Sequence, residues 1–206
     1  MRFNAGIWDI DPGKYPKAVR QKIAANQKAA LQAKRDYEER IRPLLPLSLQ
    51  RLQAIPWGHI NDGAIRKLEI NTLNQSVDFC LLCGDNPSGY FDLNLHYKDV
   101  ELDEQIVKIL CFLAHDGAEV SSHEIDLEEA EPPLFKHCIL WNTKVQTGAE
   151  EREGMKLLHY LQPETELRFG GFEMEIVSPP KGSRNDGKAK ISVVSAPPEL
   201  PGFDFL

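Results

Sequence analysis

Two segments in which apolar and polar residues alternate constrain the fold of this chain most strongly. They span residues 77–83 and 91–98, and a loop rich in glycine, proline and asparagine separates them. Alternation with a period of two is typical of β-strands, because successive side chains point to opposite faces of a sheet. The two segments therefore predict a β-hairpin with one apolar face, the pattern of an antiparallel sheet with one solvated side.

Further strands and one helix are predicted after this hairpin or just before it. Strands are expected at residues 64–70, 119–127, 134–141, 165–169 and 172–177. Gly170 and Gly171 separate the last two and predict a two-residue hairpin turn, whereas the polar segment 146–153 predicts a loop. Between Asp103, a typical N-cap, and Gly117, a typical helix stop, apolar residues recur at helical spacing. This segment predicts an amphipathic helix that packs on the sheet.

A basic helix is predicted before the sheet. It begins after Pro16 and ends near Arg42, because Pro43 and Pro46 cannot continue it. Its apolar stripe consists of Val19, Ile23, Ala30, Tyr37 and Ile41. Isolated helices of about 12–15 residues are marginal in water, so a stripe this thin predicts that the helix packs on the body or on a partner.

These elements place the chain in the α+β class. The predicted architecture is a basic N-terminal helix, a curved and mostly antiparallel sheet of about seven strands with one packed helix, and an extended proline-rich C-terminal tail. The corresponding regions are a helical arm at residues 1–56, an antiparallel β-rich body at 57–178 and a Pro/Gly-rich tail at 179–206.

Charge divides the chain at the same boundaries. Residues 1–56 contain 11 Lys/Arg and 5 Asp/Glu, a net charge of +6, whereas residues 57–178 contain 9 and 23, a net charge of −14. A basic arm beside an acidic body has two interpretations: the arm neutralises its own body, or one of the two binds an external partner. Because the acidic body repels phosphates, nucleic acid is not an expected partner.

Composition and motifs argue against several classes of protein. The longest uncharged apolar stretch, residues 109–114, is far shorter than the ~20 residues of a membrane span, and no signal-peptide apolar run follows the start. Four cysteines in a chain of this length form no disulfide framework, which predicts a cytoplasmic protein. Cys80 and Cys83 have the spacing of a zinc knuckle, but no second pair accompanies them. They are predicted to be packing residues, so neither a metal nor a cofactor is expected.

Histidines and carboxylates offer one candidate catalytic site. His59, Asp62, His123 and Glu124 have the chemistry of a metal-dependent hydrolase, provided that the sheet brings them together. Nothing in their spacing requires this. His137 shares the apolar face of its strand, which predicts a hydrogen-bonded core histidine instead of a ligand.

An acidic run on a predicted strand and its exit loop offers a candidate binding surface. Its members are Glu124, Asp126, Glu128, Glu129 and Glu131. Sites for hard divalent cations need oxygen ligands that converge from a turn, so a metal is not expected here. Two interpretations remain: a solvated, charged edge that prevents strand addition, or a surface that steers a basic partner toward the protein.

Several short motifs in the body form a set. They are Leu45-Pro46 at the start of a short helix, His59-Ile60-Asn61-Asp62-Gly63-Ala64-Ile65, Ser122-His123-Glu124-Ile125 on a strand, and Phe135-Lys136-His137 on the next strand. Together they resemble a family of functionally uncharacterised small bacterial proteins, over residues 45–177. The chain departs from the family where the usual adjacent His-Asp pair is separated by two residues.

This resemblance implies an α+β fold built on a curved antiparallel sheet, with no assigned activity. Because proteins of this kind are sometimes neighbours of toxin systems, it also implies an immunity role by analogy. The prediction is therefore a non-enzymatic interaction protein of the bacterial cytoplasm, an immunity or accessory protein that docks a basic partner through its acidic surface. The alternative is the metal-dependent hydrolase, which would require the four candidate side chains to converge in one pocket.

Overall fold

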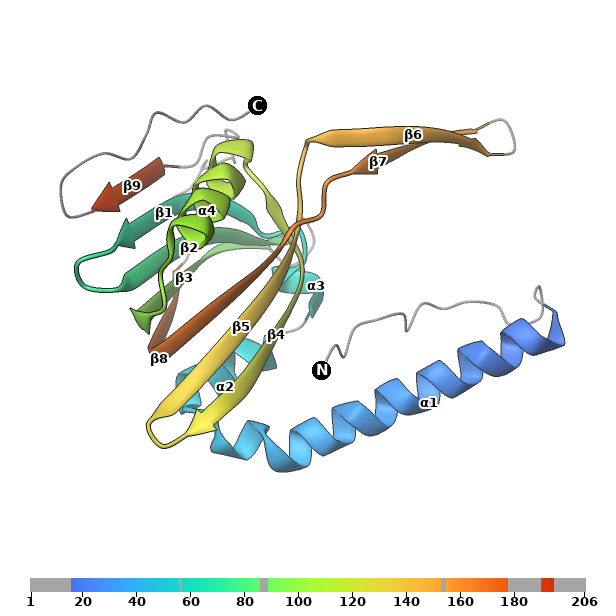
Figure 1. The fold of residues 1–206 in the computed structure, drawn as a ribbon, viewed down its shortest axis with the longest axis horizontal. Coiled ribbons are helices and arrows are strands. Elements are labelled where there is room, and N and C mark those ends of the chain that lie inside the picture. Colours follow the sequence, from blue (N-terminus) through green and yellow to red (C-terminus); the bar gives the residue numbers. More distant parts are fainter. Residues whose placement is uncertain (1–15, 56, 86–88, 153–154, 178–189, 195–206) are drawn as a thin grey trace.

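The structure of the chain is a computed structural model that describes residues 16–55, 57–85, 89–152, 155–177 and 190–194. It confirms the α+β class, with a long N-terminal helix and a large antiparallel sheet, and adds a small sheet of two strands (Figure 1). The helices are α1 (Lys17–Arg40), the 3-10 turn η2 (Arg42–Leu44), α2 (Leu47–Ala54), α3 (Trp57–Ile60) and α4 (Glu104–Asp116). The strands are β1 (Ala64–Asn71), β2 (Ser76–Asp85), β3 (Gly89–Val100), β4 (Glu119–Ala130), β5 (Pro133–Asn142), β6 (Gln146–Arg152), β7 (Met155–Tyr160), β8 (Glu164–Val177) and β9 (Lys190–Val194).

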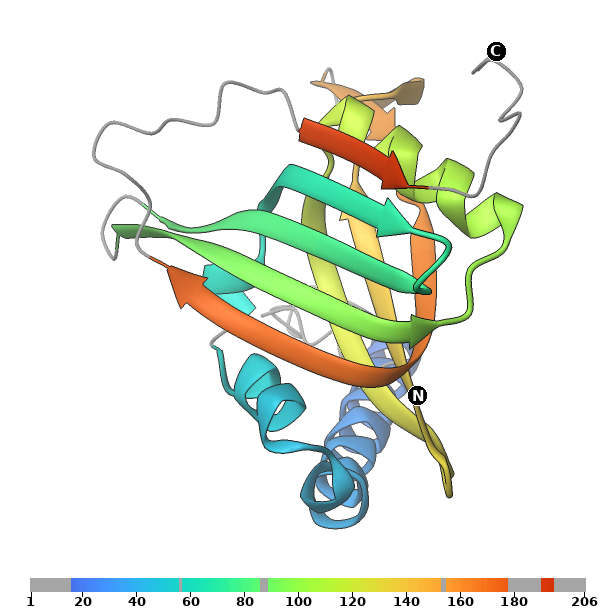
Figure 2. The same ribbon diagram turned by 90° about the vertical axis from the view of Figure 1, so that its left-hand side faces the viewer.

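The large sheet curls round until its ends approach each other (Figure 2). Its antiparallel strands are neighbours in the order β1-β2-β3-β8-β5-β4, and β1 meets β4 again through the single pair Ala64 and Glu119. Within the described residues, β9 adds a further strand that pairs in parallel with β1. The apolar side chains of all six antiparallel strands therefore face one shared interior.

Strand β8 corrects the prediction of a hairpin at Gly170 and Gly171. The chain continues through both glycines without reversing, so that residues 164–177 form one curved strand of 14 residues (Figure 2). Its first half pairs with β5 and its second half with β3. A Cβ on Gly170 would lie 3.3 Å from the Cβ of Asp99, and one on Gly171 would lie 3.2 Å from the Cβ of Lys98. The glycines thus permit close approach to β3 where the strand changes partner, and they do not form a turn.

The segment 146–153, predicted to be a loop, is a second correction. Residues 146–152 form β6, which pairs with β7 as an antiparallel hairpin that projects from the body (Figure 1). Its polar and charged sequence lacked the apolar alternation on which the strand predictions relied. In the proline-rich tail the structure describes β9 alone, so the rest of the extended tail predicted at residues 179–206 lies outside the described residues.

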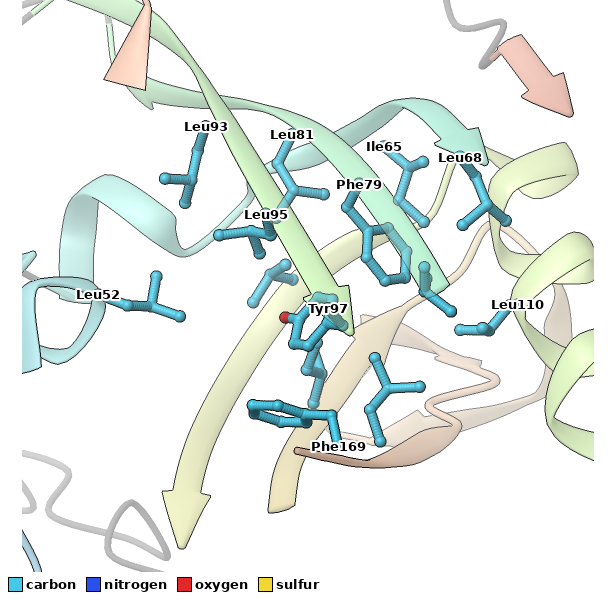
Figure 3. Packing of buried hydrophobic residues seen from close by; sticks show 14 of the residues in the cluster. Leu52, Ile65, Leu68, Phe79, Leu81, Leu93, Leu95, Tyr97, Leu110 and Phe169 are labelled. Atoms are coloured by element: carbon cyan, nitrogen blue, oxygen red, sulfur yellow. The ribbon is translucent and has the colours of Figure 1, made fainter. Parts of the chain in front are cut away.

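The core fills the inside of the curled sheet (Figure 3). Its largest fully buried side chains include Trp141, Tyr97 and Phe169, and the ring of Tyr97 meets that of Phe169 edge to face at 5.0 Å between centroids. Helix α4 covers one end of this core, and α2 covers the opposite end with Leu49 and Leu52. One apolar cluster therefore joins the predicted arm to the predicted body.

Helix α4 has the boundaries that its sequence predicts. The side chain of Asp103 accepts a hydrogen bond from the backbone N–H of Ile106 at 2.7 Å, and Gly117 ends the helix at a φ of +66°. Between them, the stripe of Val107, Leu110 and other apolar residues is buried against the sheet. Local sequence thus sets both the length of this helix and the face that it buries.

The basic helix α1 packs on the body through its last turn. Tyr37 is buried there, and its hydroxyl donates a hydrogen bond of 2.7 Å to the carbonyl oxygen of Ile125 on β4, while the amide of Gln53 donates to the same hydroxyl. Ile41 packs against the core nearby. Of the side chains described between residues 17 and 35, none is buried, and this part of the helix leads away from the sheet on the side opposite α4 (Figure 1).

The burial of Leu110 gives a direct test of the core. Because its side chain is 0 % exposed, Leu110→Ala should lower the free energy of unfolding by about 2–5 kcal/mol through lost burial and a cavity. The matched control is Gln105→Ala on the exposed side of the same helix, for which a change within about 0.5 kcal/mol is expected. Urea denaturation measures both, and equal effects of the two substitutions would contradict this account of the core.

Candidate functional site

The outer face of the curled sheet carries the charged side chains, and β8 sets its pattern. Thr165, Leu167 and Phe169 are buried in the interior, so the alternate residues Glu164, Glu166 and Arg168 point outward. On the neighbouring strand β5, the outward residues opposite these three are Leu140, Cys138 and Lys136.

Strand β4 continues this face with two of the carboxylates that the sequence singled out. Glu124 lies opposite Cys138 on β5, and Asp126 lies opposite Lys136. A row of Glu124, Cys138 and Glu166 therefore crosses three strands, with a thiol between two carboxylates. Such a row attracts cations, because the two carboxylates share one face of the sheet.

Cys138 is the residue of this row that could hold a metal ion. Its sulfur and one carboxylate oxygen each of Glu164 and Glu166 lie within 4.8 Å of one another, the one group of this kind among the described residues. Burial raises the pKa of the Cys138 thiol to about 11, and the charge of Glu166 adds to the shift. The thiol is therefore protonated at neutral pH and is a poor metal ligand or nucleophile in this setting.

A cleft of about 430 Å³ lies beside this row, between the start of α4 and the first half of β8. One wall is apolar and consists of Leu102, Ile106 and Ile109. The charged residues of its lining are Glu101, Asp103, Glu164, Glu166 and Arg168. Four carboxylates against one guanidinium give the lining a formal net charge of −3.

Ion pairs hold the basic side chains of this surface, Lys136 and Arg168, in place. Glu128 accepts from Lys136 at 3.0 Å and from the Nε of Arg168 at 3.0 Å, and Arg168 also lies 3.8 Å from Glu101. Glu128 reaches both because the register of β4 against β5 shifts between Leu127 and Glu129. Both basic side chains on this part of the outer face are thus oriented toward Glu128.

The predicted acidic run does not act as one cluster. Glu124 and Asp126 are half-buried on the outer face, and Glu128 is engaged by two cations. Glu129 and Glu131 are exposed at the far end of β4 and in the turn that follows it. Alternation along the strand explains the first group, whereas the carboxylates that β8 and α4 add to it come from distant parts of the sequence.

The four residues of the hydrolase alternative do not come together. His59 lies on α3, where it lines a mostly apolar groove of about 520 Å³ with Phe91 and Met174. Asp62 is exposed in the turn before β1, at a φ of +64°. His123 and Glu124 are consecutive on β4, and they point to opposite faces: His123 contacts the core residue His137, whereas Glu124 lies on the outer face.

A buried hydrogen-bonded chain of Tyr97, His137 and His123 was not predicted as a unit. The Tyr97 hydroxyl lies 2.7 Å from Nδ1 of His137, and Nε2 of His137 lies 3.1 Å from Nδ1 of His123. Burial raises the pKa of the Tyr97 phenol, so it keeps its proton and donates to His137. His137 is the hydrogen-bonded core histidine that its position on the apolar face predicted.

Burial keeps both imidazoles of this chain neutral. It lowers the pKa of His123 to about 4 and that of His137 well below its ordinary value, to which the neighbouring His123 contributes. Two imidazoles in direct contact cannot both be protonated without strong repulsion. The chain therefore satisfies polar groups in the core, and in the neutral form it has no charge with which to bind an ion.

Cys80 and Cys83, which have the spacing of a zinc knuckle, lie on opposite faces of β2. Cys83 is buried in the core, and burial raises the pKa of its thiol to about 12. Cys80 is half-buried on the other face of β2, because an odd separation along a strand puts two residues on opposite faces.

Comparisons with protein-family models, with curated proteins and with solved structures found no match to this chain. In the part of the chain that the structure describes, no helix is long and apolar enough to cross a membrane. The geometry of the cleft and of the outer face is therefore the basis on which function is argued.

The neutral histidines predict a specific dependence of stability on pH. An unfolded His binds a proton near pH 6.5, whereas folded His123 does so only near pH 4. The unfolded state therefore binds more protons between these values, and the free energy of unfolding should fall by on the order of 1–3 kcal/mol as the pH drops through this window.

The matched variants are His123→Gln/His137→Gln and, as a control on the surface, His115→Gln. The free energy of unfolding of the double variant should fall less steeply over the same pH window than that of the unmodified chain. This holds whatever the stability of the variant at neutral pH. His115→Gln should keep the slope of the unmodified chain. Urea denaturation at a series of pH values measures this, and an unchanged slope in the double variant would contradict the assignment.

Proposed function

We propose that this protein is a non-enzymatic interaction protein that binds a basic segment of a protein partner in the cleft between α4 and β8. The observation that carries the proposal is the combination, in one cleft, of an apolar wall with a net negative lining. Lysine and arginine side chains have the matching construction, because an aliphatic stem carries a cationic head.

The aliphatic stem and the cationic head of a lysine or arginine side chain have different contacts available in the cleft. Ile106 and Ile109 on α4 offer apolar surface to the stem, and Glu164 and Glu166 on β8 offer acceptors to the head. Arg168 is drawn toward Glu128 at 3.0 Å, which reduces its repulsion of an incoming cation. A charge-assisted hydrogen bond to a carboxylate is stronger than a neutral one, so the cleft favours a charged head over a neutral polar one.

The outer face beside the cleft extends the surface available to a partner. Glu124 and Asp126 both lie on β4, two strands away from Glu166 on β8, and on the same side of the sheet. Charges that lie outside the binding cleft contribute more to the rate of association and to specificity than to affinity. These two members of the predicted acidic run thus support the proposal as a steering surface, with the cleft as the anchoring point.

Support for the hydrolase alternative is weak, because His59, Asp62 and the pair His123 and Glu124 occupy different parts of the structure. An immunity or accessory role in the bacterial cytoplasm would use an acidic cleft to bind a basic surface of its partner. This role rests on the resemblance of the motifs between residues 45 and 177, and the cleft supplies a chemistry for it.

The proposal is tested with a fluorescein-labelled deca-lysine peptide, whose binding is followed by fluorescence anisotropy at low ionic strength. We expect Glu164→Gln/Glu166→Gln to weaken binding by about tenfold, the effect of about 1.4 kcal/mol. The matched control is Glu173→Gln/Glu175→Gln, which removes two exposed carboxylates from the outer face of the second half of the same strand. This control should weaken binding by less than about threefold.

Salt and peptide charge test whether binding is electrostatic, and the two double variants separate the cleft from general attraction. Binding should weaken as salt rises, and a deca-glutamate peptide should not bind. If both double variants weaken deca-lysine binding equally, the peptide responds to net charge and the cleft is not the site. No binding by the unmodified chain would also overturn the proposal.

A further inference from the structure

The charges of helix α1 are segregated along its length. Residues 17–35 contain six Lys/Arg and no Asp/Glu. The acidic residues of the helix, Asp36, Glu38 and Glu39, all lie in the last turn, where Tyr37 packs on the body. The part that leaves the body, residues 17–35, is therefore uniformly cationic and is called the basic arm below.

Among the described residues, few contacts stabilise the basic arm as a helix. Val19 is 41 % exposed and Leu31 is 51 % exposed, and none of the arm's described side chains is buried. A helix of this length without packing is marginal in water, and it also carries six cations at close spacing. A surface that neutralises these charges and covers the apolar residues would stabilise it.

The arm cannot reach the acidic cleft of its own chain in this arrangement. Tyr37 fixes the C-terminal end of α1 against Ile125 on β4, and the helix leads away from there on the side opposite α4 (Figure 1). The cleft lies between α4 and β8. The chain thus displays a cationic helix and an anionic cleft that do not meet each other.

Resting on the proposed function, we propose that the basic segment bound in the cleft is the basic arm of a second copy of this chain. The arm, about 28 Å long for 19 helical residues, lies along the outer face of the partner's sheet, and a lysine or arginine enters the cleft. Net charges of +6 on the arm and −3 in the cleft lining supply the complementarity. Exchange of both arms gives a closed two-fold dimer with two equivalent contacts.

The experiment is a charge exchange between two variants of the full chain. The first reverses the arm by replacing all six of its basic residues with glutamate (Lys17, Arg20, Lys22, Lys28, Lys34 and Arg35), which changes its net charge from +6 to −6. The second reverses the cleft with Glu164→Lys and Glu166→Lys, which changes the net charge of its lining from −3 to +1. Sedimentation velocity at low ionic strength should find the unmodified chain dimeric and each variant alone monomeric. An equimolar mixture of the two should be dimeric again, because each reversed arm then faces a reversed cleft.

Controls keep a folding defect distinct from a lost contact. Glu173→Lys/Glu175→Lys reverses the same number of charges on the second half of β8 and should leave the dimer intact. Circular dichroism checks that each variant is folded, and recovery of the dimer in the mixture is itself evidence that both variants are folded. High salt should dissociate the unmodified dimer.

The inference and the proposed function fail in different ways. A monomeric unmodified chain at about 100 μM and low salt, or a dimer that survives reversal of the arm, overturns the inference. Duplex DNA bound by the monomer and released on reversal of the arm would do the same and would assign the arm to phosphate binding. In each of these cases, deca-lysine binding that still depends on Glu164 and Glu166 leaves the proposed function standing.

Discussion

Strand β8 holds the two halves of the sheet together, and the remaining structure depends on its change of partner. Its first half pairs with β5 and its second half with β3, and the change occurs at Gly170 and Gly171, where a Cβ would meet the side chains of Asp99 and Lys98. Without this crossing, β4 and β5 would be joined to the other strands only by the short contact between the start of β4 and the start of β1. The continuous strand closes the sheet around Tyr97, Trp141 and Phe169, which form the centre of the core.

The same strand produces the candidate site, because alternation fixes which residues face outward. Burial of Thr165 and Leu167 puts Glu164 and Glu166 on the solvent side. Helix α4 supplies the opposite wall, and its position depends on the cap at Asp103 and on the apolar stripe that anchors it to the core. Two of the cleft's four carboxylates, those of Glu164 and Glu166, are therefore held on a strand of the sheet, while Glu101 and Asp103 lie in the short connection before α4.

Local patterns were sufficient to predict most elements. One failure, the hairpin of β6 and β7, arose because its polar sequence lacks apolar alternation, and the others arose where long-range pairing decides the outcome. The alternation of apolar and polar residues at 77–83 and 91–98 and the caps of α4 are local signals. The structure confirms the hairpin and the helix that they predict. A Gly-Gly pair between two alternating runs has the same local pattern in a hairpin and in a strand that changes partner, so the pattern alone does not distinguish β8 from a hairpin. The acidic run on β4 was visible in the sequence, but Glu164 and Glu166 join it only through the register of β5 with β8. His123 and His137 lie on the neighbouring strands β4 and β5, and their contact depends on the register between these strands, which no local pattern gives.

Amide chemical-shift mapping tests most directly whether a basic segment binds between α4 and β8. Deca-lysine is added to the uniformly ¹⁵N-labelled full chain at low ionic strength, and shifts are followed residue by residue. We expect the largest shifts in the start of α4, around Ile106 and Ile109, and in residues 164–168 of β8. Largest shifts in the apolar groove around His59 and Met174, or shifts spread evenly over all acidic residues, would contradict this expectation.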